Sequence, residues 1–393
     1  MEPKQIFKQH LAQTSLFPSA LEIFSANGSI ITDIYAKEYI DLVAGFSVNN
    51  TGHCHPAVTR AISRQLEKYL HVTVYGEWVQ QPQCHYARLL IQNLPEKLNS
   101  VFFANSGTEA IEGAIKLAKK YTKRPSIVCC RNSYHGSTAG SLSIIGRDEY
   151  KMPFRPLIPG AKTISFNCID ELNAIRSDTA AVIIEPVQGE QGVIVADPAF
   201  LHELRKRCNQ YGALLIYDEV QTGFFRTGTF FTFHASGLVP DILVAGKAMG
   251  AGMPLAGFFA SNQIMNVLSQ NPPFSHISTF GGHPLSCAAG FAGLTVLLET
   301  ISPHYIQKKA DLFRNNLVHP LIKEIRNSGL LMAVDLDDQQ LVRPAIENAL
   351  KNGVIIESFL FNKTSFRITP SLLISDDEIL SSASLLKKTL NKL

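Results

Sequence analysis

The stretch from residue 242 to residue 260, ILVAGKAMGAGMPLAGFFA, constrains the fold of this chain more than any other feature. It is about as long and as apolar as a membrane-spanning helix, yet it contains four glycines, one proline and a single charged residue, Lys247. Glycine and proline interrupt helices, and the aliphatic runs 242–245 and 255–260 have the length of strands. We therefore expect a buried hairpin within a sheet; a membrane span is the alternative that the glycines disfavour.

Short apolar runs alternate with amphipathic helical patterns between about residues 45 and 290. This alternation is typical of an α/β fold, in which helices cover a mostly parallel sheet. One helix is marked at both ends, by Asp197 and Pro198 at its start and by Gly212 just beyond its end. The expected strands are residues 101–104, 127–130, 181–185, 214–218, 242–245 and 255–260.

The chain is long enough for more than one domain, because its 393 residues exceed the roughly 250–300 residues that one core supports. The last third changes to a rhythm of helices and strands that indicates a small α+β domain, and the first 45 residues could pair with that domain or form an arm across it. We predict an N-terminal segment 1–45 joining the small domain, a large domain 46–295 and a small domain 296–393. The members expected in the last third are residues 304–318, 330–336, 354–358, 365–368 and 376–392.

The charge pattern limits the kinds of molecule that this chain is expected to bind. The formal net charge is +3, the lysines and arginines are scattered, and charged residues make up only 18% of the chain. Without a basic stripe, neither a nucleic acid nor a membrane surface is an expected partner. A shortage of charged residues suggests much buried surface, part of it between subunits. We expect small-molecule partners and a second copy of the chain.

Cysteine usage and the N-terminus indicate a cytoplasmic protein. Seven cysteines without a C-x-x-C pair argue against a disulfide framework or a thiolate metal site, and the first residues lack the layout of a signal peptide. His53-Cys54-His55 could hold a metal, but adjacent side chains on an irregular segment rarely converge. A turn at this position is the expected interpretation, so we predict no metal site.

Lys247 and Asp218 are the first candidate catalytic residues. An ammonium group in the apolar stretch loses hydration, which lowers its pKa and suits a Schiff base with an aldehyde cofactor. A lysine that reaches the surface is the structural alternative. Asp218 ends the strand 214–218, at the edge where ligands bind in parallel sheets, and Lys247 follows the next strand. For this carboxylate, a helix cap and an ion pair with Arg226 are the alternatives.

Two further segments follow predicted strands. Ser106, Gly107 and Thr108 open a helix, where free N–H groups bind anions such as a phosphate; Ser106 and Glu109 also fit a purely structural capping box. Tyr134 follows strand 127–130, and its ring could stack on a flat cofactor. The adjacent histidine, His135, is more often a core residue than a base.

Acidic and basic side chains at other strand positions suggest substrate contacts. Glu185 and Glu190 lie five residues apart at the end of a strand, where they could bind a substrate amine or mask an arginine. Arg367 alternates with apolar neighbours on the strand 365–368 of the small domain. Arginine is the side chain best suited to bidentate recognition of a carboxylate.

Together these segments resemble the class III aminotransferases of fold type I, the group that includes acetylornithine, ornithine and 4-aminobutyrate aminotransferases. The similarity runs in the family's order from YIDLVAG at residues 39–45 and GHCHP at 52–56 to Arg367. Its most specific motifs are DEVQTG at 218–223, AGK at 245–247 and STFGGHP at 278–284. The resemblance implies pyridoxal 5'-phosphate as cofactor, a large domain with a mostly parallel seven-stranded sheet, and a small α+β domain built from both termini.

The resemblance also implies a role for each matching residue. Lys247 would form the internal aldimine, Asp218 would pair with the pyridine nitrogen, and Tyr134 would stack on the ring. Arg367 would bind the carboxylate of glutamate or 2-oxoglutarate, and Glu190 would mask it when an ω-amino donor is bound. Family members share their active sites within a homodimer, so Thr279 and Ser278 would reach in from the partner subunit. The implied cofactor-binding set is Ser106, Gly107, Thr108, Tyr134, Asp218, Glu219, Val220, Gln221, Lys247 and Thr279, and the implied substrate-binding set is Glu185, Glu190, Ser278 and Arg367.

Two departures from the family pattern concern the donor and a nearby loop. Acetylornithine and ornithine enzymes usually have an arginine, which holds the carboxylate of the donor, where this chain has Ser137. Phe225 replaces a glycine after the aspartate motif. The leading hypothesis is transfer of an amino group from an ω-amino donor of the acetylornithine or ornithine kind to 2-oxoglutarate. The alternatives are another ω-amino acid transaminase, an aminomutase, a decarboxylating transaminase, and a non-catalytic regulator that binds the cofactor.

Overall fold

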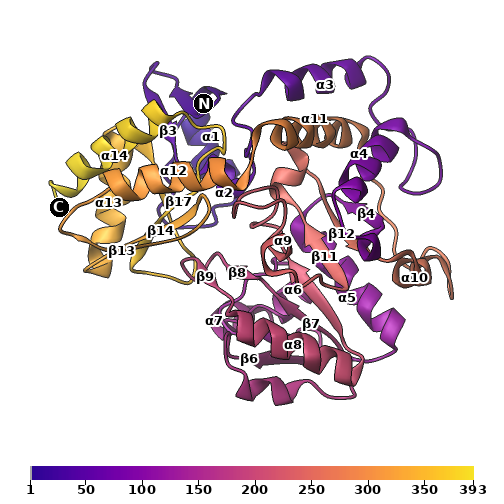
Figure 1. Ribbon diagram of the computed structural model, residues 1–393. Coiled ribbons are helices and arrows are strands. Elements are labelled where there is room, and N and C mark those ends of the chain that lie inside the picture. Colours follow the sequence, from indigo (N-terminus) through magenta and orange to yellow (C-terminus); the bar gives the residue numbers. More distant parts are fainter. Residues whose placement is uncertain (1) are drawn as a thin grey trace.

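A computed structural model describes residues 2–393, and its centre is a seven-stranded sheet (Figure 1). All neighbouring pairs between β6 and β11 are parallel, whereas β12 runs antiparallel to both of its neighbours. The predicted mostly parallel α/β sheet is therefore confirmed. In spatial order the strands are β4 (Ser100–Ala104), β12 (Ala256–Ala260), β11 (Ile242–Ala245), β10 (Leu214–Asp218), β7 (Thr179–Ile184), β5 (Ser126–Cys130) and β6 (Ala161–Ile164).

The apolar stretch 242–260 forms the expected hairpin. Its strands β11 and β12 pair antiparallel, with Ile242 opposite Ala260 and Ala245 opposite Gly257, and both are buried throughout. The short 3-10 helix η4 (Lys247–Gly250) begins the connection between them. Within residues 2–393 no single helix has the length and apolar character needed to cross a bilayer. Two successive helices, Pro284–Thr300 and Pro303–Asn316, meet those criteria only as a pair bent by 82°.

Helices cover both faces of the central sheet because its strands alternate side chains between two apolar layers. Ile216 of β10 faces the layer of α5 (Gly107–Thr122), whereas Leu215 and Tyr217 face the layer of α8 (Pro198–Tyr211). Three more helices, α3 (Pro56–Leu66), α4 (Gln81–Gln92) and α11 (Pro284–Thr300), pack together beyond β4 and β12 (Figure 1). Shorter elements are α6 (Ala139–Ser143), α7 (Asp148–Lys151), α9 (Phe233–Ser236), α10 (Asn262–Met265), β8 (Val187–Gln188) and β9 (Ile194–Val195).

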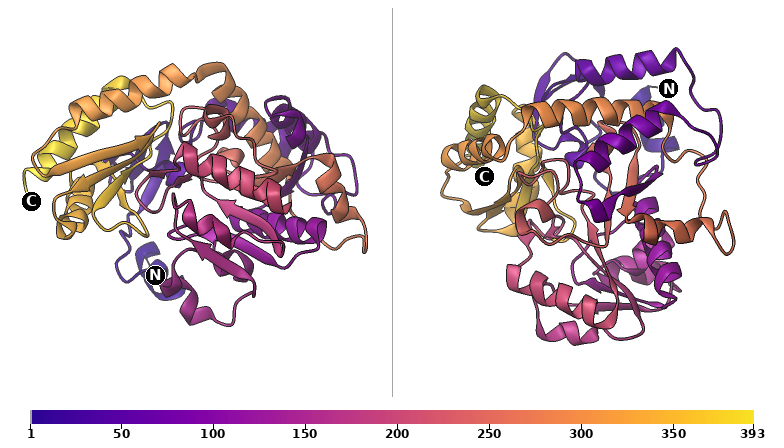
Figure 2. Two further views of the ribbon diagram at one scale, coloured as in Figure 1. Left: turned by 60° about the horizontal axis from the view of Figure 1, so that its bottom comes forward. Right: turned by 45° about the vertical axis from the view of Figure 1, so that its right-hand side comes forward.

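Segments from both ends of the chain form a second group of elements beside the central sheet (Figure 2). Strand β3 (Glu38–Asp41) pairs parallel with β15 (Val354–Ile355), which places the N-terminal segment beside the C-terminal part. One four-stranded sheet has the order β1-β2-β3-β15 and the other has the order β13-β14-β17-β16. The remaining members are β1 (Ile23–Asn27), β2 (Ile30–Asp33), β13 (Ile322–Ser328), β14 (Leu331–Leu336), β16 (Glu357–Ser358), β17 (Ser365–Ile368), α1 (Pro3–His10), α2 (Ala44–Ser47), α12 (Pro303–Asn316), α13 (Val342–Lys351) and α14 (Asp376–Leu390).

The predicted ends of α8 lie at the expected residues, but the capping hydrogen bond expected at its start does not form. Gly212 adopts the left-handed conformation (φ 64°) that ends α8, as expected of a glycine just past a helix. Asp197 occupies the position before α8, but its carboxylate accepts no hydrogen bond from the first turn. Ser375 instead forms a full capping box at α14 with Glu378.

Candidate active site

A cavity of about 240 Å³ opens at the carboxyl ends of the parallel strands, the edge at which ligands bind in folds of this class. It joins segments that are far apart in sequence, and nine of the residues singled out from the sequence line it. Three others come from the loop after β5. The lining residues are Gly107, Thr108, Tyr134, His135, Gly136, Ser137, Glu185, Glu190, Asp218, Val220, Gln221 and Lys247.

Lys247 enters this cavity from the turn after β11. Its backbone lies in the left-handed region (φ 50°), which side chains other than glycine rarely adopt, and such strain concentrates at functional sites. Burial lowers the pKa of the Lys247 ammonium, an effect that the nearby charges of Glu190 and Asp218 partly offset. A lowered pKa increases the neutral fraction of the amine, and because Lys247 lines the cavity, the surface-lysine alternative does not hold.

Asp218 lies at the carboxyl end of β10 with 5% of its surface exposed. Its Oδ1 accepts a hydrogen bond from the Val220 N–H at 3.1 Å, and its Oδ2 lies 2.8 Å from His135 Nδ1. The suggested ion pair between Asp218 and Arg226 is wrong. Arg226 is fully buried elsewhere, where its guanidinium donates to the carbonyl of Leu330 and to Asn50 Oδ1.

The start of α5 forms one wall of the cavity. Ser106 precedes the helix and its hydroxyl accepts a hydrogen bond from the Glu109 N–H, as predicted. The other half of the expected capping box is wrong, because the Glu109 carboxylate accepts from the N–H of Asn105 instead. A side chain at Gly107 would lie 2.9 Å from Val220, so only glycine leaves the helix start this close to the cavity. The Thr108 hydroxyl hydrogen-bonds that of Ser141 at 2.7 Å.

The loop after β5 carries an aromatic ring over the opposite side of the cavity. The backbone N–H of Tyr134 donates to Glu185 Oε1 at 2.8 Å, which ties this loop to the end of β7. Burial raises the pKa of Tyr134, and the charge of Glu190 raises it further. The Tyr134 ring packs near that of Phe361, with 6.4 Å between ring centroids. Tyr134 is therefore held at the cavity by a backbone hydrogen bond and by the packing of its ring.

Glu219 and Gln221 are both close to Asp218 in the sequence, but their side chains lie in different surroundings. Gln221 lines the cavity, and its Nε2 is buried without a hydrogen-bond partner among residues 2–393. Glu219 does not line the cavity. Its carboxylate accepts hydrogen bonds from Thr222 and from the N–H and hydroxyl of Thr232, which closes the following loop. Burial raises the pKa of Glu219 to about 7.

Arg367 and Glu190 form a buried ion pair beside the cavity, with 2.6 Å between Nη2 and Oε2. Burial tends to raise the pKa of Glu190, but the charge and hydrogen bond of Arg367 outweigh it, so the pKa is lowered. The guanidinium lies between the rings of Phe46 and Phe359, 5.0 and 4.4 Å from their centroids. Nε and Nη1 of Arg367 have no hydrogen-bond partner within the described chain. This fully buried arginine, which does not itself line the cavity, therefore has two unsatisfied donors.

Ser278 and Thr279 do not line the cavity of their own chain, although Asn105 Nδ2, just before the start of α5, lies 3.4 Å from Ser278 Oγ. The Ser278 hydroxyl accepts a hydrogen bond from the Gly281 N–H at 2.9 Å, and Thr279 is exposed. The histidines of the HCH sequence diverge: His53 pairs with Asp41, and His55 caps the start of α3. No group of three or more potential metal ligands occurs among residues 2–393.

The family model described as Aminotransferase class-III matches residues 14–390. This chain is a class-III aminotransferase. It is 39% identical over 377 residues to an acetylornithine aminotransferase of Methanopyrus kandleri, a match covering 95% of each chain. It is 37% identical to ornithine aminotransferase 1 of Staphylococcus aureus, over 92% of each. The solved ornithine aminotransferase of Toxoplasma gondii, with partial occupancy of pyridoxal phosphate, superposes with a TM-score of 0.91 at 30% identity and covers 99% of this chain and 93% of that one.

The aminotransferase is a transferase that depends on pyridoxal phosphate, and its cavity has the groups that this cofactor requires. A helix start with a glycine at its first position suits the phosphate. A buried carboxylate, Asp218, suits a protonated ring nitrogen, and the unpartnered Nε2 of Gln221 suits a ring oxygen. The residues present therefore fit the cofactor.

Sequence patterns missed three features of this site. His135 was given no role beyond the core, although it hydrogen-bonds Asp218. The aromatic contacts of Phe46 and Phe359 with Arg367 cross between distant segments, so no local pattern could reveal them. A run of positive φ values at residues 44–47 accompanies Phe46, but backbone conformation is not visible in a sequence.

Proposed function

We propose that the enzyme transfers the amino group of an ω-amino donor of the acetylornithine or ornithine class to 2-oxoglutarate, with Lys247 as the catalytic residue. The observation that carries this proposal is the buried Arg367–Glu190 ion pair beside the Lys247 cavity. The relatives named acetylornithine and ornithine aminotransferases support the donor class.

Different residues of the cavity would bind different parts of the cofactor. When bound, pyridoxal phosphate supplies an aldehyde carbon and a ring that accepts electrons. The N–H groups of Gly107 and Thr108 would hold its phosphate, Tyr134 would cover one ring face and Gln221 would donate to the ring hydroxyl. Asp218 would hold a proton on the ring nitrogen. Ser106 and Glu219 would act indirectly, by shaping the helix start and the loop after β10.

Lys247 would act as both nucleophile and proton carrier. Because its pKa is lowered, a larger fraction of the amine is neutral than for an exposed lysine. Its Nζ would take the proton from the amine-bearing carbon of the donor and hold it for return. Glu185 borders the space next to Nζ, where its carboxyl group would contact the donor amine.

Arg367 would recognise the acceptor. An arginine with two unpaired donors can bind a carboxylate in a bidentate manner once Glu190 moves aside. With an ω-amino donor, which presents no carboxylate at this position, Glu190 would remain on Arg367 and neutralise it. One cavity would thus accept two unlike substrates in turn.

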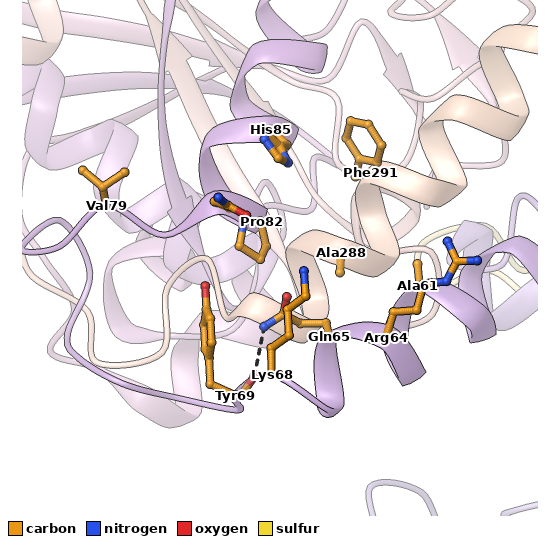
Figure 3. A pocket seen from close by; sticks show the side chains of 11 residues that line it. Ala61, Arg64, Gln65, Lys68, Tyr69, Val79, Pro82, His85, Ala288 and Phe291 are labelled. Carbon is orange, nitrogen blue, oxygen red and sulfur yellow. Dashed lines mark hydrogen bonds between the residues drawn. The ribbon is translucent and has the colours of Figure 1, made fainter.

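We propose a homodimer in which Ser278 and Thr279 complete the partner's site. In support, Thr279 is exposed and does not line its own cavity. A separate hollow of about 500 Å³ between α3, α4 and α11 is lined by apolar and basic side chains but no acid (Figure 3). Large apolar side chains exposed over the same region suit contact with a second copy. They are Leu66, Leu70, Trp78, Val79, Phe280 and Phe291.

A cytoplasmic location remains part of this proposal. The seven cysteines all carry free thiols, as in a reducing compartment.

Arg367→Ala tests the acceptor site. Losing a charge-assisted bidentate contact should raise the apparent KM for 2-oxoglutarate at least about tenfold, measured as glutamate formed with a fixed donor. The donor half-reaction, followed by cofactor absorbance without acceptor, should change much less. Arg326→Ala is the control, because Arg326 pairs with Asp335 on the same sheet and does not border the cavity. An unchanged KM in Arg367→Ala would refute the two-substrate model.

A donor panel then identifies the substrate. Ornithine, acetylornithine, succinylornithine, 4-aminobutyrate and lysine would each be assayed with 2-oxoglutarate. Carbon dioxide release, or product without glutamate formation, would instead indicate the decarboxylating or aminomutase alternatives.

A further inference from the structure

Glu112, on the second turn of α5, connects the start of that helix to the segment 136–141, which leads into α6. We propose that Glu112 is a positioning residue, which holds Thr108 and the segment 136–141 in the arrangement that binds the phosphate of the cofactor. The inference rests on the proposed placement of that phosphate at the start of α5.

The Glu112 carboxylate accepts three hydrogen bonds from this segment. Its Oε1 accepts from the N–H of Gly140 at 2.8 Å, from the N–H of Ser141 at 3.2 Å and from the Thr138 hydroxyl at 2.6 Å. Thr138 precedes α6 but provides no side-chain cap for it. The carboxylate of a different helix therefore satisfies N–H groups in the first turn of α6 and ties α6 to α5.

A cluster of hydroxyl groups extends this contact to Thr108. Thr108 Oγ1 lies 2.8 Å from Thr138 Oγ1 and 2.7 Å from Ser141 Oγ, and it accepts a hydrogen bond from the Thr138 N–H at 3.2 Å. Because Thr138 donates its single hydroxyl hydrogen to Glu112, Thr138 Oγ1 can only accept from the other two hydroxyl groups. Glu112 thus orients the hydroxyl cluster around Thr108, whose own N–H would hold the phosphate.

Two glycines show how closely the segment 136–141 approaches α5. A Cβ atom at Gly140 would overlap Glu112 Oε2, and one at Gly136 would lie 2.5 Å from Thr108 Oγ1. Gly136 and Thr108 line the cavity, whereas Glu112 does not. Glu112 therefore acts on the cavity only through the residues that it holds in place.

Two substitutions of Glu112 separate its acceptor oxygen from its length. Glu112→Met has no acceptor oxygen, whereas Glu112→Gln keeps an amide oxygen that can accept the same hydrogen bonds. Each purified variant, stripped of cofactor, would be titrated with pyridoxal phosphate and with pyridoxal, which lacks the phosphate, while its absorbance is recorded. In Glu112→Met we expect about tenfold weaker binding of pyridoxal phosphate, with the affinity for pyridoxal within about twofold of wild type. Glu112→Gln should bind both compounds within about threefold of wild type.

Thr138→Val tests the same connection from the other side. It keeps a branched side chain but removes the hydroxyl that lies between Glu112 and Thr108. It should also weaken the binding of pyridoxal phosphate more than that of pyridoxal. Since the two residues act through one cluster, the double variant Glu112→Met/Thr138→Val should bind about as Glu112→Met alone does. Thr138→Val also carries the test should Glu112→Met not fold.

Glu171→Met is the matched control. The Glu171 carboxylate accepts from the N–H of Ser165 at 2.7 Å and from its hydroxyl at 2.9 Å, and Glu171 does not line the cavity. It thus makes the same kind of contact elsewhere in the chain. Urea unfolding of the cofactor-free proteins should show that both methionine variants lose stability. Only Glu112→Met should lose part of its preference for pyridoxal phosphate over pyridoxal.

Three results would overturn the inference: wild-type affinity for pyridoxal phosphate in Glu112→Met, equal losses for pyridoxal phosphate and pyridoxal, or the same loss of preference in Glu171→Met. Gly107→Ala distinguishes this failure from that of the proposed function, because its Cβ would lie 2.9 Å from Val220 and shift the helix start. If Gly107→Ala loses the preference while Glu112→Met keeps it, the phosphate site stands and only the positioning role of Glu112 fails. If both variants keep the preference, the proposed phosphate site fails as well.

Discussion

Gly189→Ala tests the role of Gln221 without altering Gln221 itself. A Cβ atom at position 189 would overlap Gln221 Oε1 and would lie 2.8 Å from its Cδ, where ordinary contacts begin at 3.4 Å. The overlap with Oε1 means that the amide must move by more than the few tenths of an ångström that a merely tight contact would require. Gly189 does not have a positive φ, so alanine fits its backbone, and the side chain that must move is flexible. The substitution should displace the amide without unfolding the protein.

The expected effect is the loss of one hydrogen bond to the cofactor. A typical hydrogen bond contributes about 0.5–1.5 kcal/mol net, which corresponds to about two- to tenfold weaker binding of pyridoxal phosphate. Titration of cofactor-free protein, followed by absorbance, measures this directly. Gln221→Leu should give a loss of similar size, because it removes the same donor.

The double variant Gly189→Ala/Gln221→Leu provides the decisive comparison. If both changes act through one hydrogen bond, the second adds almost nothing to the first. Additive losses, or unchanged affinity in Gly189→Ala beside a clear loss in Gln221→Leu, would show that the Gln221 amide does not reach the cofactor as proposed.

Two more predictions concern pH and donor choice. Because burial raises the pKa of Glu219 from 4.5 to about 7, its contribution to stability is fully present below about pH 4.5 and is lost as the pH rises through 7. Between pH 4.5 and pH 8, the free energy of unfolding of the wild type, measured in urea, should fall by about 3 kcal/mol relative to that of Glu219→Gln. The same pH dependence in both proteins would contradict the raised pKa. Ser137 is exposed at the cavity, so Ser137→Arg adds a cation there. This variant should lower the KM for donors that carry a carboxylate about tenfold relative to the KM for cadaverine, a donor without one. Equal changes in KM for both donors would argue against a contact at residue 137.

Local patterns predicted the architecture well because the relevant physics is local. The runs 214–218 and 242–245 are strands β10 and β11 with the predicted bounds, and the glycines of residues 246–252 make the turn that carries Lys247. The polar residues that follow each strand then meet at one sheet edge, which is a property of parallel sheets. The cluster of Lys247, Asp218 and Tyr134 could therefore be predicted before any coordinates existed.

Side-chain partners were harder to predict, because several acceptors compete for each donor. Arg226 follows Asp218 by eight residues and seemed a reasonable partner, yet it crosses to Asn50 and Leu330. Glu109 has the spacing of a capping box but binds one residue further back, at Asn105. Sequence spacing restricts which groups are near, whereas the loop conformation decides which pair forms.

The three carboxylates of the cavity show how surroundings give one chemical group different tasks. Burial and the charge of Asp218 raise the pKa of Glu185 well above its ordinary value, which favours its protonated form. Glu190 has the opposite shift because Arg367 contacts it. In the proposed mechanism, an acceptor carboxylate on Arg367 would leave Glu190 without its cation, which would raise the pKa of Glu190. Binding of the acceptor would then be coupled to proton uptake by Glu190, which would keep the charge of the cavity balanced while the two substrates alternate.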